Sequence, residues 1–203
     1  MLYYIAIILL FIPLVILYPT KVIGKRNIPK KGGVILCGNH QSNVDVLLFA
    51  IKFRRQKFLA KKELSKNWFS KSLLKSLGCI FVDRKNPGVE AYKKVCAHLN
   101  KGGAMTIFPE GTRKITTEES MAMKNGVAMF ALKTSSPVVP ISIIKKPSIF
   151  RRNVILVGEP FYFEKVDKIT KDVLNKNSQI LSDKILELRS DYLNKKAKKH
   201  KSK

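Results

Sequence analysis

The sequence predicts a single α/β domain in which helices flank a largely parallel or mixed sheet, preceded by an apolar N-terminal helix that anchors it to a membrane. Two observations favour this fold class. Short apolar runs typical of buried strands alternate with segments whose apolar residues recur at helical spacing. The chain also has 203 residues, enough for one sizeable core and too few for two.

The first 18 residues are almost wholly apolar. They lack the basic start and small-residue cleavage site of a signal peptide, so we expect them to be retained. As a helix this segment spans about 25 Å, slightly less than the hydrocarbon thickness of about 30 Å. We predict a membrane anchor at residues 1–20, either spanning or in-plane, with a buried core helix as the alternative. The basic residues that follow, Lys21, Lys25 and Arg26, place the remaining chain on the cytoplasmic side of the cell membrane.

After the anchor, predicted strands and helices alternate. A helix that begins near Ser42 follows the first strand, and Asn86-Pro87 opens another that ends at Gly102. Within residues 64–77, Trp68 lies at helical spacing, so we expect it to pack in the core rather than to form a second membrane-facing patch. The strands are predicted at 34–37, 57–60, 78–82, 104–108, 138–144 and 154–157, and the remaining helices at 64–77, 127–131 and 173–192.

The charge of the chain is strongly positive. Lysine and arginine total 39 against 14 acidic residues, a formal charge of +25. This excess implies a polyanionic partner or substrate, for which nucleic acid and an anionic membrane surface are the two large candidates. Six lysines lie in residues 195–203, which we predict to be a disordered basic tail. Taking these six from +25 leaves +19 on the predicted anchor and on the domain predicted at residues 21–194.

The three cysteines are odd in number and lie in apolar surroundings. Reduced, buried thiols fit this pattern best and indicate a cytosolic catalytic domain. Cys37 and His40 have the spacing of half a zinc site, but no second pair completes it, so no metal is expected.

The polar segment from Asn39 to Asp45 follows the first predicted strand. Here His40 lies at a strand end, where an imidazole can take a proton from an alcohol if a second group fixes its tautomer. Asp45 can be that group if a turn separates the two, and the intervening polar residues supply one. Ser42 and Asp45 also form a capping-box pattern that would start a helix without chemistry, and the two roles are compatible.

Two further charged loops follow predicted strands, at Asp83-Arg84 and at Glu110-Gly111-Thr112-Arg113. Ligands collect at the carboxyl ends of strands in such sheets. An arginine there can hold a phosphate with two parallel bonds, and a glycine lets backbone N–H groups approach it. Together the loops describe a pocket with one general base and two arginines, which suits an alcohol that carries a phosphate.

Four motifs in this order and spacing resemble those of the glycerolipid acyltransferases, over most of the chain between Val22 and Ile143. They are Asn39-His40-x-x-x-x-Asp45, Gly78-x-x-Phe81-Val82-x-Arg84, Phe108-Pro109-Glu110-Gly111-Thr112-Arg113 and Val138-Val139-Pro140-Ile141.

The resemblance implies transfer of an acyl chain from acyl-CoA or acyl-carrier protein to the free sn-2 hydroxyl of 1-acyl-glycerol 3-phosphate (lysophosphatidate), giving phosphatidate. It implies no cofactor, no metal and no covalent acyl-enzyme, although a covalent route through Cys37 is conceivable. The implied roles are general base for His40, orienting partner for Asp45, phosphate binding for Arg84 and Arg113, completion of the acceptor site for Glu110, Gly111 and Thr112, a channel wall for Pro140, and support for Asn39, Ser42, Asn43, Phe108 and Pro109.

Two alternatives remain. One is a related enzyme that acylates another lysolipid or glycerol 3-phosphate. The other is a non-catalytic basic protein that binds a membrane or nucleic acid. It accounts for the charge but not for the placement of His40, Asp45, Arg84 and Arg113, so we expect no nucleic-acid partner.

Overall fold

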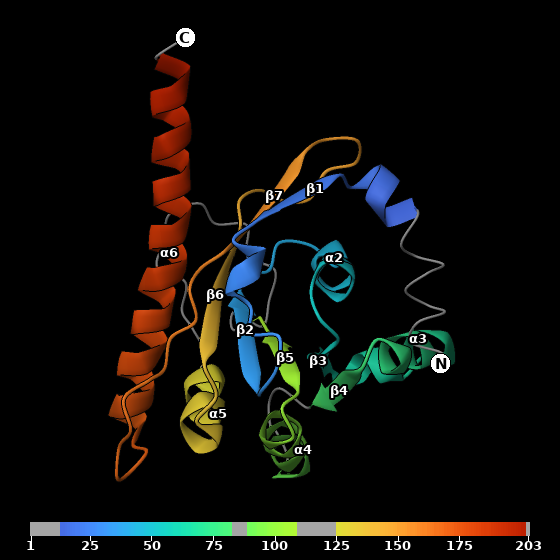
Figure 1. Cartoon of the computed structure of the whole chain (residues 1–203). Helices are drawn as coiled ribbons and strands as arrows, with labels where there is room; N and C mark the ends of the chain where they lie inside the picture. The colour runs from blue at the N-terminus through green and yellow to red at the C-terminus, as the bar shows by residue number, and fades with distance from the viewer. Residues whose placement is uncertain (1–12, 83–88, 109–124, 202–203) are drawn as a thin grey trace.

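The fold, taken from a computed structural model that describes residues 13–82, 89–108 and 125–201, is a seven-stranded sheet with helices on both faces (Figure 1). The strand order is β1-β7-β6-β2-β5-β3-β4. Neighbouring strands are parallel except β6 and β7, so the predicted largely parallel sheet is confirmed. The strands are β1 (Thr20–Ile23), β2 (Val34–Gly38), β3 (Gln56–Lys61), β4 (Cys79–Val82), β5 (Ala104–Ile107), β6 (Val138–Ile143) and β7 (Asn153–Val157).

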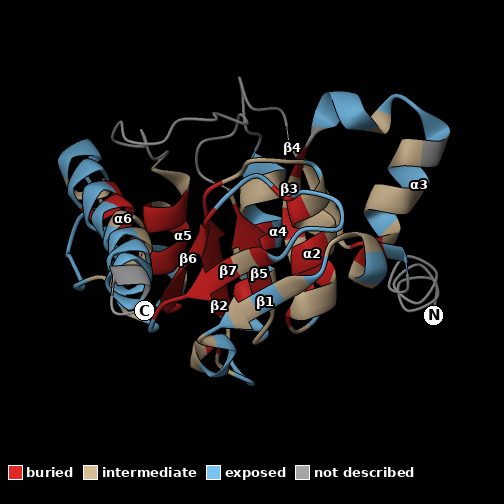
Figure 2. Cartoon of the chain, turned by 90° about the horizontal axis from the view of Figure 1, so that it is seen from above, coloured by how far each residue is buried: buried red, intermediate tan, exposed pale blue. Residues whose placement is uncertain are grey.

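Helices cover both faces of the sheet because successive residues of β2 point in opposite directions. Val34 and Leu36 pack with α2 and α3, whereas Ile35 and Cys37 pack with α4, α5 and α6. Figure 2 shows the buried sheet between these layers. The helices are α2 (Val44–Lys52), α3 (Trp68–Ser76), α4 (Val89–Asn100), α5 (Gly126–Thr134) and α6 (Lys171–Lys201), with short 3-10 turns η1 (Lys25–Asn27) and η2 (Lys62–Ser65).

The three central strands β2, β5 and β6 are buried along their whole length. Parallel strands that are covered on both faces consist of continuous apolar runs, and for this reason these three strands could be predicted from the sequence. Leu36 pairs with Thr106 on one side and with Val139 on the other. The carboxyl ends of these strands therefore lie at one edge of the sheet, where the polar segment after β2 begins.

Two expectations about single elements were wrong, and one strand was missed. Trp68 is 80% exposed at the start of α3, because the predicted helix is broken into η2 and α3 and its apolar spacing is interrupted. The basic tail is helical as far as Lys201, because lysine and alanine favour helix and extend one already packed on the sheet through Leu181 and Ile185. Strand β1 was not predicted.

Most of the predicted anchor lies outside the described residues. Residues 13–17 are helical, and Ile16 is exposed. None of the helices in the described part of the chain is both long enough and apolar enough to cross a bilayer.

Candidate active site

His40 lies two residues beyond β2, at the carboxyl edge of the sheet. Its Nδ1 atom is 2.9 Å from Oδ2 of Asp45, and its side chain is 14% exposed. The predicted contact between these two residues is therefore confirmed. The ring is mostly enclosed but is still accessible from solvent. A side chain that contacts a substrate needs such access.

The Asp45 carboxylate is fully buried in the first turn of α2. Its Oδ2 atom also accepts hydrogen bonds from the backbone N–H groups of Gln41 and Ser42, both at 2.7 Å. One carboxylate oxygen thus holds both the imidazole and the backbone of the turn that leads into α2, and its bond to the N–H of Ser42 is one half of the predicted capping box. The Ser42 hydroxyl lies 3.4 Å from the N–H of Val44, and Asn43, the N-cap residue, makes no capping bond with its side chain.

This contact determines which ring nitrogen can act on a substrate. An ionised carboxylate only accepts hydrogen bonds, so the proton lies on Nδ1 of His40 and points to Asp45. In the neutral ring, Nε2 then carries the free lone pair. The arrangement is chemically suited to removing a proton from a hydroxyl group.

The loop that carries His40 is attached to β6 by two amide side chains. Asn39, which is buried, donates through Nδ2 to the carbonyl oxygen of Ile143 at 3.0 Å and accepts from the N–H of Ile143 at 2.7 Å. Gln41 donates to the same carbonyl at 3.0 Å. Asn39 thereby continues the pairing of β2 with β6 beyond the last strand residue, which fixes the position of the histidine.

Phe108 forms one wall beside the imidazole. The rings of Phe108 and His40 stack with their centroids 4.4 Å apart and their planes at 21°. Phe108 also packs against Phe49 of α2 at 5.3 Å. This aromatic contact restricts rotation of the imidazole about its Asp45 bond.

The structure brings together His40, Asp45, Asn39 and Phe108, which were predicted from the sequence. Pro140 is buried within β6 and pairs with Cys37, three residues before Ile143. Sequence reasoning missed Gln41 and Ile143 as part of the site. Gln41 lies inside the recognised motif, whereas Ile143 acts through its backbone, which no residue type reveals. The other predicted site residues, Arg84, Pro109, Glu110, Gly111, Thr112 and Arg113, lie outside the described residues.

The three cysteines form no disulfide. Burial raises the pKa of the Cys79 thiol to about 12, so it stays protonated at neutral pH. Cys37 is buried in β2. Within the described ranges, no group of His, Cys, Asp and Glu side chains is arranged to hold a metal ion.

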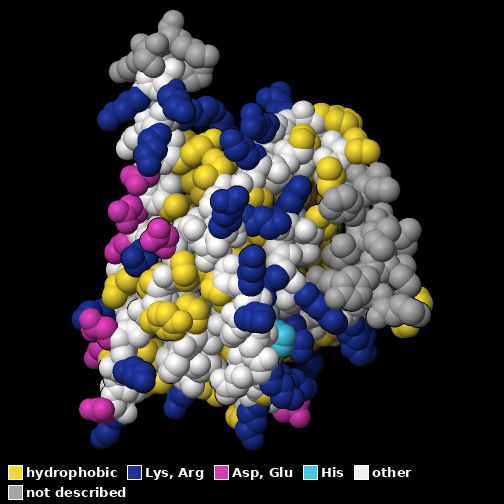
Figure 3. Space-filling view, in the orientation of Figure 1, with side chains coloured by type: hydrophobic (Ala, Val, Ile, Leu, Met, Phe, Trp, Pro, Cys, Tyr) yellow, Lys and Arg dark blue, Asp and Glu magenta, His cyan; other side chains and the backbone are white. Residues whose placement is uncertain are grey.

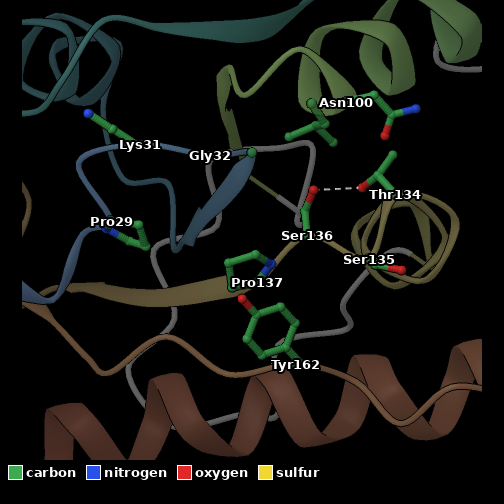
Figure 4. Close-up of a pocket in the computed structure, with 11 residues that line it drawn as sticks. Pro29, Lys31, Gly32, Asn100, Thr134, Ser135, Ser136, Pro137 and Tyr162 are labelled. Atoms are coloured by element: carbon green, nitrogen blue, oxygen red, sulfur yellow. Dashed lines mark hydrogen bonds between the residues drawn. The ribbon is translucent and has the colours of Figure 1, made fainter.

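A separate pocket of about 460 Å³ lies at the opposite edge of the sheet (Figure 4). Gly33 and Pro137, which precede β2 and β6, line it together with Tyr162, and the hydroxyls of Thr134 and Ser136 are bonded at 2.8 Å. None of the predicted site residues lines this pocket. It therefore plays no part in the chemistry at His40.

The fold and the site together define an α/β enzyme in which a histidine held by a buried carboxylate follows a central strand. A family model described as Acyltransferase matches residues 19–144, which is more than half of the chain. The chain belongs to this family and is an acyltransferase. The resemblance seen in the four motifs is confirmed, and the non-catalytic alternative is set aside.

Individual relatives agree with this assignment. The 1-acyl-sn-glycerol-3-phosphate acyltransferase of Bacillus subtilis is 30% identical over 176 residues, which cover 83% of this chain and 87% of the relative. That of Borreliella burgdorferi is 34% identical over 137 residues, covering 66% of this chain and 54% of the relative. The chain thus spans most of the first protein and about half of the second.

The fold is similar to one solved by crystallography. The 1-acyl-sn-glycerophosphate (LPA) acyltransferase PlsC of Thermotoga maritima superposes with a TM-score of 0.64 at 28% identity. The match covers 84% of this chain and 72% of that structure. The predicted α/β architecture is therefore shared with a solved acyltransferase.

Proposed function

We propose that this enzyme transfers an acyl chain from a thioester donor to the free sn-2 hydroxyl of 1-acyl-glycerol 3-phosphate and so forms phosphatidate for phospholipid biosynthesis. The observation that carries the proposal is the His40–Asp45 contact at the strand end. This contact supports a role for His40 as proton acceptor, and the relatives of the chain are named 1-acyl-sn-glycerol-3-phosphate acyltransferase.

In the proposed mechanism, His40 is the general base and Asp45 its orienting partner. Nε2 removes the proton of the lipid hydroxyl as its oxygen attacks the thioester carbonyl carbon. The tetrahedral intermediate collapses, its carbon–sulfur bond breaks, and the imidazolium returns the proton to the leaving sulfur. The products are an ester and a free thiol, and Asp45 stabilises the imidazolium formed between the two steps.

The acceptor phosphate is assigned to Arg84 and Arg113, since guanidinium groups bind phosphate in a bidentate manner. Glu110, Gly111 and Thr112 would complete that site, and Pro140 would shape the wall of the acyl or donor channel. Basic side chains also suit the donor, because acyl-CoA and acyl-carrier protein are both anionic. No cofactor or metal enters this mechanism.

The proposal places the enzyme at the cell membrane. Residues 1–20 would act as the anchor and residues 21–194 as the catalytic domain on the cytoplasmic side, with the basic segment at residues 195–203 beside them. The basic flank after the apolar segment and the formal charge of +25 support this orientation on an anionic surface.

The test is a competition assay on the purified full chain. Lysophosphatidate, glycerol 3-phosphate and other lysolipids would be offered together with acyl-CoA or acyl-carrier protein, and the products identified by mass. We expect phosphatidate as the main product. Preferential acylation of another acceptor would overturn the assignment in favour of a related acyltransferase.

A further inference from the structure

The loop between β6 and β7, residues 144–152, exposes two large apolar side chains. Phe150 is 73% exposed and Ile149 is 51% exposed. The backbone of Phe150 has φ of 57°, a left-handed conformation that is costly for an aromatic residue. An exposed aromatic tip held at this cost needs a role outside the core, since core packing explains neither side chain.

The tip is held firmly by hydrogen bonds at its base. Asn153 accepts from the N–H of Ser148 at 2.9 Å through Oδ1 and donates through Nδ2 to the carbonyl oxygen of Ser148 at 3.3 Å. The N–H of Phe150 donates to the carbonyl oxygen of Leu17 at 2.7 Å. Hydrogen bonds therefore fix the loop both internally and to the end of the apolar N-terminal segment.

Four cations flank the apolar tip in the sequence. Lys145 and Lys146 precede it, Arg151 and Arg152 follow it, and all four are exposed. No acidic residue occurs between residues 144 and 158, so the loop carries a formal charge of +4. Apolar side chains flanked by basic ones match the boundary between acyl chains and anionic headgroups.

The loop lies at the same edge of the sheet as His40. It leaves β6 immediately after Ile143, the residue to which Asn39 is bonded. Figure 1 shows the loop beside the short N-terminal helix that includes the exposed Ile16. In Figure 3 hydrophobic side chains gather at this corner, and lysine and arginine side chains lie close to it.

We propose that the β6–β7 loop is a membrane-docking element in which Ile149 and Phe150 enter an anionic phospholipid surface while the four cations bind its phosphates. The inference rests on the proposed function, since a lipid acceptor has to reach His40 from a bilayer. Docking at this loop would turn the His40 edge of the sheet toward the lipid and shorten the path of the acceptor.

Brominated lipids test the position of Phe150 directly, because they quench tryptophan on contact with the acyl region. The chain has one tryptophan, so Trp68→Phe/Phe150→Trp places a single probe in the loop. Trp68→Phe/Tyr162→Trp is the matched control, because Tyr162 is 68% exposed and follows Phe161, which pairs with Val138 at the start of β6. We expect quenching and a blue shift on brominated anionic vesicles for the first variant only.

Equal emission from both variants on protein that co-sediments with the vesicles would overturn the proposal. Equal emission is the result expected if the tip is a binding site for an acidic protein and does not enter lipid. Acyl transfer to lysophosphatidate is measured in the same samples. Quenching without phosphatidate formation would therefore reject the proposed function and leave the docking loop in place, whereas phosphatidate formation without quenching would reject only the loop.

The role of the cations has its own test. Lys145→Gln/Lys146→Gln should weaken binding to anionic vesicles by about fivefold for each lysine near the surface, which corresponds to about 1 kcal/mol per cation. The matched control is Lys165→Gln/Lys168→Gln, two exposed lysines that follow Tyr162. An equal loss of binding in both variants would show that the charge acts without regard to position and would contradict docking at this loop.

Discussion

At the scale of single residues, one oxygen of Asp45 performs two tasks. It accepts hydrogen bonds from the backbone N–H groups of Gln41 and Ser42, in the turn before α2, and contacts the imidazole of His40, all within 2.9 Å. A carboxylate in this position cannot move without breaking the bonds that hold this turn. The orientation of the proposed base is therefore fixed by the same bonds that fold the loop.

Replacement of this carboxylate by an amide separates the two tasks. In Asp45→Asn the side-chain oxygen can still accept the backbone bonds, but a neutral amide no longer stabilises an imidazolium. We expect the rate of acyl transfer to fall by about 10²- to 10⁴-fold with little change in the unfolding temperature. Asp183→Asn on the exposed face of α6 is the control. A full rate in Asp45→Asn would show that the carboxylate only caps the helix.

His98 gives a pH dependence of stability that is independent of the active site. Its Nε2 donates to the carbonyl oxygen of Ala104 at 2.9 Å, and burial lowers its pKa from 6.5, with Lys57, Arg54 and Arg55 acting in the same direction. As the pH falls, the unfolded chain therefore takes up this proton before the folded chain does. The contribution of His98 to the free energy of unfolding is complete above about pH 6.5 and is lost progressively below it.

The corresponding variant is His98→Gln, which can keep the bond to Ala104 but does not titrate. Thermal unfolding measured from about pH 7 to about pH 5 should show a smaller decline for this variant than for the native chain. An identical decline in the two proteins would mean that other groups cause it.

At the scale of elements, Asn39 joins the ends of β2 and β6 by a pair of side-chain bonds to Ile143. Asn39→Ala leaves the buried N–H of Ile143 without that partner, at a cost of about 1–3 kcal/mol in the free energy of unfolding. Because the His40 loop is attached there, we expect the rate to fall as well. Chemical denaturation and the rate of acyl transfer check both effects.

The control for this variant is Asn175→Ala, which removes an exposed amide pair with Asn125. Its unfolding free energy should remain within about 0.5 kcal/mol of the native value. Equal stability of the Asn39 and Asn175 variants would contradict the role assigned to the β2–β6 attachment.

The elements that the sequence predicted well are those whose pattern has one physical cause. β2, β5 and β6 are buried on both faces and so form continuous apolar runs. β1 has only four residues of alternating burial, and its partner β7 lies far along the chain, so no local pattern reveals it. Trp68 keeps helical spacing, but spacing alone does not say where a 3-10 turn divides the helix.

The same limit applies to the site. His40 and Asp45 could be paired from the sequence because a strand end, a turn and a helix start lie within a few residues. The attachment to Ile143 joins residues 104 positions apart through backbone atoms and could not be predicted. Stacking of Phe108 on His40 depends on the register of β5 beside β2, which the sequence does not state.

At the scale of the whole molecule, charge is unevenly distributed. Figure 3 shows acidic side chains along α6, whereas lysine and arginine spread over the rest of this face. The carboxyl-terminal part of α6 is again basic, with Lys195, Lys196, Lys198 and Lys199 on one helical segment. A cationic helix end of this kind favours contact with an anionic bilayer.

Deletion of residues 195–203 should lower affinity for anionic vesicles by about 1 kcal/mol for each lysine that lies near the surface. Turnover on a soluble acceptor should not change, because no predicted site residue lies in this segment. Vesicle co-sedimentation and a detergent-free assay measure the two quantities. Vesicle binding that is unaffected by the deletion would show that the segment is simply solvated.

The most direct measurement for the central claim is the initial rate of phosphatidate formation by His40→Ala, purified as the full chain. Removal of the general base should reduce this rate by about 10²- to 10⁴-fold while membrane association survives. His98→Gln, which alters a histidine outside the site, should keep most of the native rate. A near-normal rate in His40→Ala would contradict proton removal by this histidine.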